Sequence, residues 1–337
     1  MRAIITGVGH YAPETRLTNK DLEKMVETSD EWITSRTGIK ERRILGDGKG
    51  VSYMGVRAAQ ALLKRRNISA DELDLIIVGT VTPDMISPSA AAIIQRELKA
   101  TNCWGFDVNG GCSGFIFAFG AATQFIETGK CKKVLVIGGD KMSGLLDYED
   151  RNTCAIFGDG AGAILLEPSD EEDDGVKDFL FGMDGSGADS LHVKAGGSLH
   201  PPTHETVDKK MHYVFQDGKT VFKKAVKGMA DVSVEILKKN NFTSDDLKLL
   251  IPHQANIRII DAVSKKLGLP PEKVAINIDR YGNTTSGTIP IALSEAYEAG
   301  KLEKGDWILV SAFGAGFTWG SVLFKWAMDK PSPVAAN

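Results

Sequence analysis

Cys112 has the surroundings of a nucleophile rather than those of an ordinary buried thiol. It follows an Asn-Gly-Gly turn signal at 109–111, and an apolar run long enough for a buried helix begins at Phe115. A helix N-terminus favours a thiolate because its N–H groups are unpaired, and the glycines let a substrate approach the sulfur. We predict that Cys112 attacks a substrate, with a buried structural thiol as the alternative. The structural interpretation is the one we give to Cys103, Cys131 and Cys154.

His253 and Asn283 offer an imidazole and an amide from the ends of predicted elements. His253 follows an apolar strand, where Pro252 ends the hydrogen-bond ladder and places the imidazole at the strand's C-terminal edge. Asn283 lies in a loop of Gly, Asn and Thr that leads into a helix. A thiol, an imidazole and an amide are residue types of covalent catalysis, although a lone histidine in such a position is often structural.

An internal duplication explains how these residues could meet. The stretch LLKRRNISADELDLIIV aligns with ILKKNNFTSDDLKLLI at an offset of 236 − 62 = 174 residues. Cys112 and Asn283 are 283 − 112 = 171 apart, the offset that also relates Gly129 to Gly300. The two residues therefore hold equivalent places in two related halves. If a pseudo-twofold axis relates the halves, both helix starts could face one cleft, with His253 at a strand end of the second half.

Each half is predicted to alternate helices with buried strands. Short Val, Ile and Leu runs at 73–79, 133–139, 161–167 and 306–312 lack the alternation of half-exposed strands. Such runs indicate strands that helices cover on both faces. The pattern predicts an α/β fold. Two copies would pack most economically as five layers, in the order helix, sheet, helix, sheet, helix.

The boundaries follow from changes in composition. We place an N-terminal half with the nucleophilic cysteine at 1–169, a C-terminal half with the histidine and asparagine at 176–328, and a flexible tail at 329–337. The acidic run at 168–175 is interpreted as a solvated turn. The segment at 182–219 has little periodicity and is predicted to form a lid, a pocket wall or a dimer arm.

Composition argues against several other classes of protein. The 40 Lys and Arg residues and the 44 Asp and Glu residues give a net charge of 40 − 44 = −4. The chain therefore has no overall positive potential that would attract nucleic acid. No stretch reaches the roughly 18 uncharged apolar residues of a membrane span. Four cysteines without a CxxC pair, and histidines at 192–212 without acidic or cysteine partners in register, predict no metal site. We therefore expect a protein of the reducing cytoplasm without a membrane or nucleic-acid partner.

Four motifs occur in order over essentially the whole chain. They are NGGCSGF around Cys112, PHQAN around His253, GNTTSGTIPIAL around Asn283 and the C-terminal FGAGFTWGS. Together they resemble β-ketoacyl-acyl carrier protein synthase III of the thiolase-like superfamily. The resemblance implies a duplicated thiolase-like fold and a homodimer. It also implies an acyltransferase that begins fatty-acid biosynthesis by condensing a short acyl-CoA with malonyl-acyl carrier protein, without a prosthetic group.

The residue types suit this condensation. A Cys112 thiolate would take the acyl group from coenzyme A, and a malonyl thioester would then lose carbon dioxide to leave an enolate. His253, through Nε2–H, and the Asn283 amide would stabilise the enolate, because neutral donors do so without protonating it. By family analogy, the backbone N–H groups of Cys112 and Ala315 would hold the second oxyanion.

Further positions match those of the family that bind coenzyme A. Trp32 and Arg151 resemble the pair that sandwiches the adenine. Arg36 resembles a phosphate contact, and Asn256 is expected near the pantetheine arm. Carrier protein is acidic, so a local basic face is expected despite the net charge. The candidates are Lys223, Arg258, Lys265 and Lys266, the last two with a solvated helix face as the alternative.

The acyl pocket shows one departure from the family pattern. The residues that the resemblance assigns to this pocket are Ile86, Ser87, Met142, Phe157 and Phe313. The family often has a bulky aromatic residue just before the proline of PDMISPSAA, reaching across the dimer to close the partner's pocket, and here that position is Ser87. We therefore expect primers longer or more branched than acetyl to be accepted.

Other functions stay open on sequence alone. A relative from specialised metabolism could pass the acyl group to an amine, an alcohol or another acceptor. A Cys-His-Asn thiol hydrolase would discharge the acyl-enzyme to water. A non-enzymatic dinucleotide-binding protein is the remaining alternative, with GVGHYA at 7–12 as a weak fingerprint.

Overall fold

A five-stranded sheet forms the first half of the chain. The structure, a computed structural model, describes residues 1–331, so residues 332–337 of the predicted tail lie outside the described part. The strand order is β1-β7-β6-β4-β5. The bounds are β1 Arg2–Tyr11, β4 Leu75–Gly79, β5 Trp104–Val108, β6 Val134–Lys141 and β7 Asp159–Ser169.

The second half repeats this sheet with four strands, in the order β11-β12-β13-β8. Their bounds are β8 Gly175–Met183, β11 Leu247–Pro252, β12 Trp307–Gly314 and β13 Thr318–Lys325. The two sheets share a pattern of three neighbouring strands. In the first half, β6 pairs parallel with β4 and antiparallel with β7. In the second half, β12 pairs parallel with β11 and antiparallel with β13. The predicted duplication is confirmed, and the half boundaries at 169 and 176 stay a prediction.

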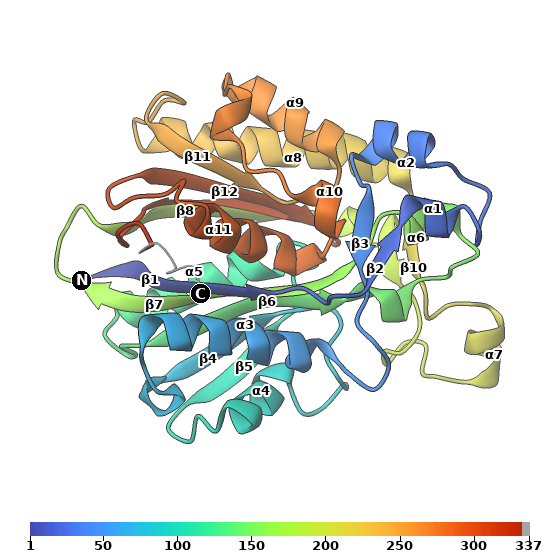
Figure 1. The fold of residues 1–337 in the computed structure, drawn as a ribbon, viewed down its shortest axis with the longest axis horizontal. Helices are drawn as coiled ribbons and strands as arrows, with labels where there is room; N and C mark the ends of the chain where they lie inside the picture. The colour runs from blue at the N-terminus through green and yellow to red at the C-terminus, as the bar shows by residue number, and fades with distance from the viewer. Residues whose placement is uncertain (332–337) are drawn as a thin grey trace, which may run out of the picture.

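Helices cover both sheets and separate them, which confirms the five predicted layers (Figure 1). The outer helices are α3 Val51–Arg66 and α4 Ala90–Leu98 on the first sheet, and α8 Gly218–Lys239 and α9 Ile257–Leu267 on the second. Between the sheets lie α5 Gly114–Glu127 and α11 Thr288–Glu298. The shorter elements are β2 Arg16–Thr18, α1 Asn19–Leu22, α2 Asp30–Thr37, β3 Glu41–Arg43, α6 Arg151–Cys154, β9 Leu191–Val193, α7 His204–Asp208, β10 Val214–Gln216 and α10 Ile278–Tyr281.

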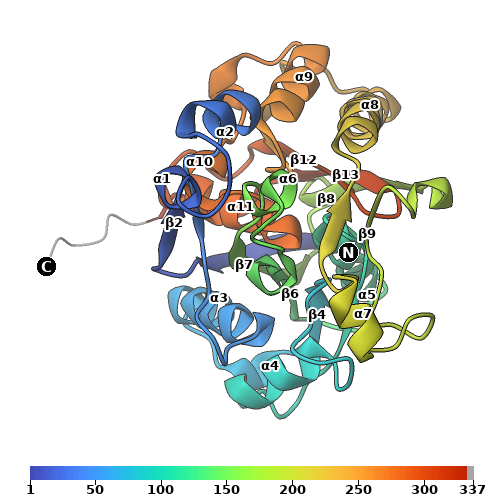
Figure 2. The same cartoon turned by 90° about the vertical axis from the view of Figure 1, so that its right-hand side faces the viewer.

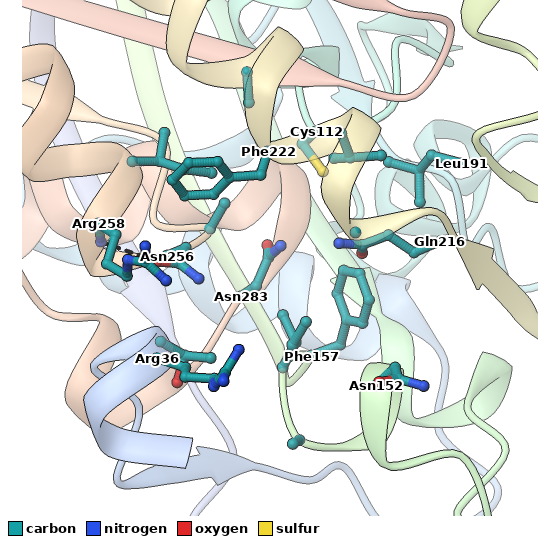
Figure 3. A pocket seen from close by; sticks show the side chains of 18 of the residues that line it. Arg36, Cys112, Asn152, Phe157, Leu191, Gln216, Phe222, Asn256, Arg258 and Asn283 are labelled. Carbon is teal, nitrogen blue, oxygen red and sulfur yellow. Dashed lines mark hydrogen bonds between the residues drawn. The ribbon is translucent and has the colours of Figure 1, made fainter. Parts of the chain in front are cut away.

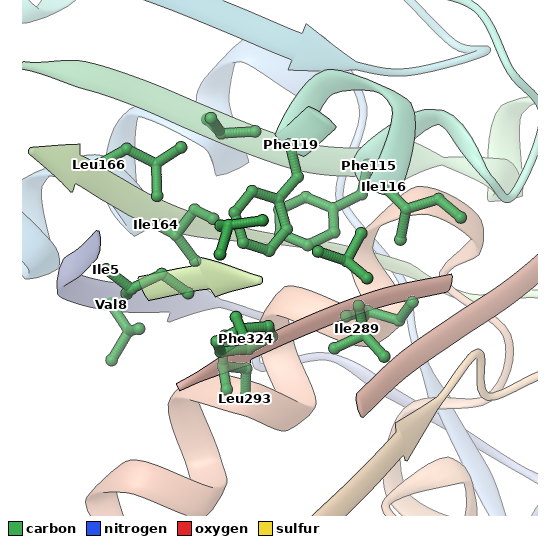
Figure 4. Packing of buried hydrophobic residues seen from close by; sticks show 14 of the residues in the cluster. Ile5, Val8, Phe115, Ile116, Phe119, Ile164, Leu166, Ile289, Leu293 and Phe324 are labelled. Atoms are coloured by element: carbon green, nitrogen blue, oxygen red, sulfur yellow. The ribbon is translucent and has the colours of Figure 1, made fainter. Parts of the chain in front are cut away.

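The largest hydrophobic cluster lies between the two sheets. It contains Phe115 and Phe119 of α5, Leu293 of α11 and Phe324 of β13, all nearly inaccessible to solvent (Figure 4). Because α5 contacts both sheets, its sequence is apolar around most of its circumference rather than along one stripe. The central layer therefore fixes the positions of the loops that precede α5 and α11.

The segment at 182–219 forms a wall beside the open end of the central layer. Its strands β9 and β10 pair with each other, and α7 projects from the body of the molecule (Figures 1 and 2). The Lys210 ammonium ties this excursion to Asp147 at 2.8 Å and to Glu149 at 2.5 Å. The acidic run forms the exposed β7–β8 turn, as predicted. No helix within residues 1–331 is long and apolar enough to cross a membrane.

Candidate active site

The starts of the two central helices open into one pocket. Cys112 lies two residues before α5, and Asn283 precedes the turn that leads into α11. A pocket of about 550 Å³ is lined by both residues and by His253, which follows β11. The labelled Cys112 and Asn283 side chains point into this pocket (Figure 3). The structure thus brings together the three residues predicted to carry the chemistry.

The turn that carries Cys112 packs backbone to backbone against the β12–β13 turn. Gly111 has φ +58°, and a Cβ there would lie 2.6 Å from Ala315 N. A Cβ at Gly314 would lie 2.5 Å from Cys112 N. Only glycine permits this approach. The Cys112 and Ala315 amides therefore lie close together, and neither donates to a protein acceptor within residues 1–331, so both N–H groups remain available for an oxyanion.

The Cys112 side chain is a thiol in the resting site. Burial raises the pKa of Cys112 to about 12, and the Asp140 carboxylate acts in the same direction. This corrects the expectation that the helix N-terminus lowers this pKa, because removal of the thiolate from water is the larger effect here. The proton must therefore leave the sulfur as the sulfur attacks its substrate.

His253 is a neutral imidazole held at one ring nitrogen. Its backbone N–H donates to Ser311 O at 2.8 Å, which continues the β11–β12 ladder. Its Nδ1 lies 2.7 Å from Thr288 Oγ1, so Nε2 is the nitrogen left for a ligand. Burial lowers the pKa of His253 to about 3, and the ring stays uncharged at neutral pH. A neutral Nε2–H donor requires the Thr288 hydroxyl to donate to Nδ1 rather than to Thr285 O, which lies 3.0 Å from the same hydroxyl oxygen.

Replacing Thr288 by valine is expected to slow the condensation that the resemblance implies about tenfold, because the tautomer with Nε2–H loses its supporting hydrogen bond. The measurement is the steady-state rate of β-ketoacyl product formation with acetyl-CoA. Thr288→Ser keeps the hydroxyl and should restore most of the rate. Equal rates for the valine and serine variants would show that the Thr288 hydroxyl does not set the tautomer.

The Asn283 amide is oriented by its own loop. Thr285 N donates to Asn283 Oδ1 at 2.8 Å, so the oxygen is already paired and Nδ2 is the group that can donate to a ligand. A short bridge to the chain before β7 fixes the backbone: Asn283 N donates to Ile156 O at 2.9 Å, and Gly158 N donates to Asn283 O at 3.0 Å. The loop therefore presents an amide donor beside Cys112.

Three side chains predicted to contact coenzyme A gather at the pocket mouth. The Trp32 ring has the Arg151 guanidinium 5.6 Å and the Arg36 guanidinium 5.3 Å from its centroid, and all three residues line the pocket. Arg151 also donates to Glu27 O at 3.0 Å, which ties α6 to the loop before α2. Aromatic and guanidinium planes in this arrangement suit an adenine ring.

The basic candidates are not all at the mouth. Asn256 caps α9 by accepting from Arg258 N at 2.9 Å, and both residues line the pocket. Lys223 is exposed on α8 without lining the pocket, and Lys265 and Lys266 lie in the last turn of α9, at the opposite end from Asn256. The four basic candidates are therefore spread along α8 and α9, and their contact with carrier protein stays a prediction.

The predicted acyl-pocket residues fall into three groups. Phe157 and Phe313 line the pocket, and Met142 is buried behind Phe157 in one apolar cluster. Ile86 is 86% exposed and Ser87 is exposed as well, so neither lines the pocket of its own chain. The resemblance assigns these two to a partner's pocket, which a single chain does not test.

Sequence reasoning missed several residues that shape the site. Thr288 and Asp140 are buried polar residues whose roles depend on contacts with distant segments, and no local pattern marks them. The segment at 182–219 also contributes residues that line the pocket, and its length without periodicity was the one sequence signal for such a role. The lining residues missed from this wall and from α8 include Leu191, Gln216, Lys219 and Phe222.

Comparison with known proteins decides the family. Residues 106–185 match the model of 3-oxoacyl-[acyl-carrier-protein] synthase III, and residues 237–326 match the model of its C-terminal region. The β-ketoacyl-[acyl-carrier-protein] synthase III of Chlorobaculum tepidum is 54% identical over 97% of this chain and 100% of its own length. The chain belongs to the 3-oxoacyl-[acyl-carrier-protein] synthase III family.

Solved structures agree with this assignment. The synthase III of Aquifex aeolicus superposes with a TM-score of 0.89 at 45% identity, covering 96% of this chain and 100% of that one. The priming β-ketosynthase of the R1128 polyketide pathway superposes at 0.90 with 33% identity, covering 98% and 97%. Both likenesses confirm the predicted thiolase-like fold. The synthase III family is a family of condensing acyltransferases, so the enzyme class predicted from the motifs is confirmed too.

Proposed function

We propose that this chain performs a decarboxylative Claisen condensation of a short acyl-CoA with malonyl-acyl carrier protein, the step that initiates fatty-acid biosynthesis. The observation that carries the proposal is one pocket lined by a thiol, Cys112, and by two neutral side-chain donors, His253 and Asn283. The backbone N–H groups of Cys112 and Ala315, which have no acceptor within residues 1–331, lie close together at the turn that carries the thiol. The named relatives are synthases of this kind, and they favour condensation over transfer to another acceptor.

The first half-reaction is acyl transfer to Cys112. The sulfur attacks the thioester carbonyl, and the oxyanion is held by the N–H groups of Cys112 and Ala315. The carbon–sulfur bond to coenzyme A then breaks, and the leaving thiolate carries away the proton that Cys112 loses. An acyl-Cys112 thioester remains. No prosthetic group takes part in this proposal.

The second half-reaction is condensation. The malonyl thioester loses carbon dioxide, and the electron pair of the broken carbon–carbon bond becomes an enolate. His253 Nε2–H and Asn283 Nδ2–H donate to the enolate oxygen, and a neutral imidazole and an amide stabilise it without quenching it. The enolate carbon attacks the acyl-Cys112 carbonyl, and collapse of that tetrahedral intermediate releases the β-ketoacyl thioester and the Cys112 thiolate, which takes up a proton.

Substrate binding is proposed at the mouth. Trp32 and Arg151 would enclose the adenine, Arg36 would contact a phosphate, and Asn256 would reach the pantetheine arm. Arg258, which lines the pocket, would contact an acidic carrier protein, and the exposed Lys223 would be a more distant contact. Lys265 and Lys266 would meet only a carrier that extends along the whole of α9.

We also propose that the protein works as a homodimer. Strand β5 is an edge strand, and its Trp104 is 50% exposed against Phe125 of α5. Phe181 and Met183 of β8 are exposed as well, and Phe181 packs on Phe117 of the same helix. Sedimentation should give the mass of two chains, and Phe181→Asp should shift it toward one. A wild-type mass of one chain at micromolar concentration would contradict the proposal.

Intact-mass spectrometry tests the function directly. Wild type incubated with acetyl-, isobutyryl- or hexanoyl-CoA should gain the matching acyl mass, and malonyl-acyl carrier protein should discharge the adduct as a β-ketoacyl product. Because Ser87 replaces a bulky residue, adducts from isobutyryl-CoA and hexanoyl-CoA are expected beside acetyl. An acetyl-only profile would contradict the open pocket, and discharge to water would support a hydrolase.

A further inference from the structure

Asp140, at the end of β6, is a buried carboxylate with hydrogen-bond donors around both oxygens. It has no solvent exposure, and it does not line the pocket. Its Oδ1 accepts from Val81 N at 2.7 Å and Thr82 N at 3.0 Å. The hydroxyls of Thr80 and Thr82 donate to the same oxygen at 2.8 and 2.9 Å. One carboxylate oxygen thus holds the loop that follows β4.

The other oxygen holds the loop that carries Asn283. Thr285 Oγ1 donates to Asp140 Oδ2, and Ser286 N donates to it at 3.2 Å. Each of these residues also reaches the catalytic groups: Thr285 N donates to Asn283 Oδ1 at 2.8 Å, and Ser286 Oγ donates to Gly111 O at 3.0 Å. Asp140 is therefore linked through one intervening residue to each part of the site: through Thr285 to the Asn283 amide, and through Ser286 to Gly111, the residue before Cys112.

We propose that Asp140 is a positioning residue of the condensation, which fixes the Asn283 loop of the second half against the Cys112 turn of the first. This inference rests on the proposed function and adds a residue to it. Burial raises the pKa of the Asp140 carboxyl, and the hydrogen bonds that it accepts act in the opposite direction. The backbone amides of Val81, Thr82 and Ser286 can only donate, so these contacts suit an ionised acceptor better than a neutral amide. A misplacement of about 1 Å in such a site can lower the rate about 100-fold.

The charge has a second consequence, for the thiol. The Asp140 carboxylate raises the pKa of Cys112, in addition to burial. His253, which lines the pocket with Cys112, has its pKa lowered to about 3 by burial and contributes no charge at neutral pH. The charged residues that line the same pocket are Arg36, Arg151, Lys219 and Arg258. The residues that pack on the Cys112 turn from the α11 side and from the β12–β13 turn, Ser286 and Ala315, are uncharged.

Asp140→Asn is the test variant, because it keeps the shape and removes the charge. With four donors around the Oδ1 position, the asparagine oxygen is expected there, which leaves its NH2 facing the N–H of Ser286. Condensation should fall about 100-fold. Acetyl transfer from acetyl-CoA should stay within about threefold of wild type. The pH profile of iodoacetamide alkylation, read at the Cys112 peptide, should move to lower pH, with a rate about tenfold higher at a fixed neutral pH.

Asp159→Asn is the matched control. Asp159 is equally buried and accepts from Leu45 N at 2.7 Å and from Ser143 N and Oγ at 2.8 and 2.7 Å, none of them in the loops that carry the catalytic groups. This variant should not move the alkylation profile. If both variants lower condensation and neither moves the profile, Asp140 is a general structural residue and the proposal is overturned.

Thr285→Ala keeps the proposal testable if Asp140→Asn does not fold. It removes one donor to Oδ2 and leaves the charge, so condensation should fall about tenfold while the alkylation profile stays that of wild type. Wild-type condensation in Thr285→Ala would overturn the positioning role. The alkylation measurement uses no substrate, so a wild type that makes no β-ketoacyl product would reject the proposed function and leave the relation of Asp140 to Cys112 measurable.

Discussion

Cys112→Ser is expected to form no acyl adduct with any acyl-CoA and to lose at least about 10⁴-fold of the condensation rate, as enzymes do when the covalent nucleophile is removed. A serine hydroxyl is a weaker nucleophile than a thiol, and His253 is held neutral by burial rather than tuned as a strong base. The measurement is intact mass after incubation with acetyl-CoA, followed by the product assay with malonyl-acyl carrier protein.

The control for this variant is binding. Because serine fills the same space as cysteine, calorimetric titration with coenzyme A should give the wild-type affinity through the mouth residues Trp32, Arg36 and Arg151. An acyl adduct on the serine variant, or one that maps to Cys131 or Cys154, would return Cys112 to the role of a structural thiol.

Asn283→Ala is expected to separate the two half-reactions. It removes the Nδ2–H donor to the enolate, so decarboxylation should fall about 10²- to 10³-fold, the range for one oxyanion donor. Acyl transfer uses the backbone N–H groups of Cys112 and Ala315, so the acyl adduct should still form at a rate within about fivefold of wild type. The measurement is release of labelled carbon dioxide from malonyl-acyl carrier protein beside adduct formation from acetyl-CoA.

Asn283→Asp distinguishes the donor from the loop contact. A carboxylate can still accept from Thr285 N, which Asn283 Oδ1 does at 2.8 Å, but it cannot donate to an enolate. Decarboxylation should therefore stay lost in the aspartate variant. Recovery there would mean that Asn283 only holds its loop, and equal losses in both half-reactions of the alanine variant would mean that the acyl-transfer site depends on it as well.

The sequence predicts three residues that the structure brings into one pocket, because the internal repeat places two of them in equivalent positions. Cys112 and Asn283 each precede the central helix of their own half, and the chain packs these helices, α5 and α11, in a shared central layer. Uniformly apolar strands indicate from the sequence alone that helices cover both faces of the sheet, and every residue of β4 is buried accordingly. A local sequence pattern is sufficient to predict a residue's position when that position is set by the helix, strand or turn that contains it.

Local sequence patterns do not predict properties that arise from contacts between residues far apart in the chain. The pKa of Cys112 is raised because the assembled pocket buries the thiol, whereas the sequence shows only a helix start that would lower it. Thr288 meets His253 across 35 residues of chain, and Asp140 meets Thr285 across 145. The sequence also does not show that α9 places Lys265 and Lys266 at the opposite end from Arg258; the docking role of all three stays a prediction.

Because α5 and α11 lie together between the two sheets, activity requires that both halves of the chain are folded and docked. The thiol comes from one half of the chain and both of its neutral donors come from the other. An intermediate with one half structured would hold a thiol or a pair of donors, but no catalytic centre. Substitutions in the central layer, such as Phe119→Ala, should therefore reduce the active fraction whenever they loosen the docking of the halves, far from the pocket and without touching a substrate.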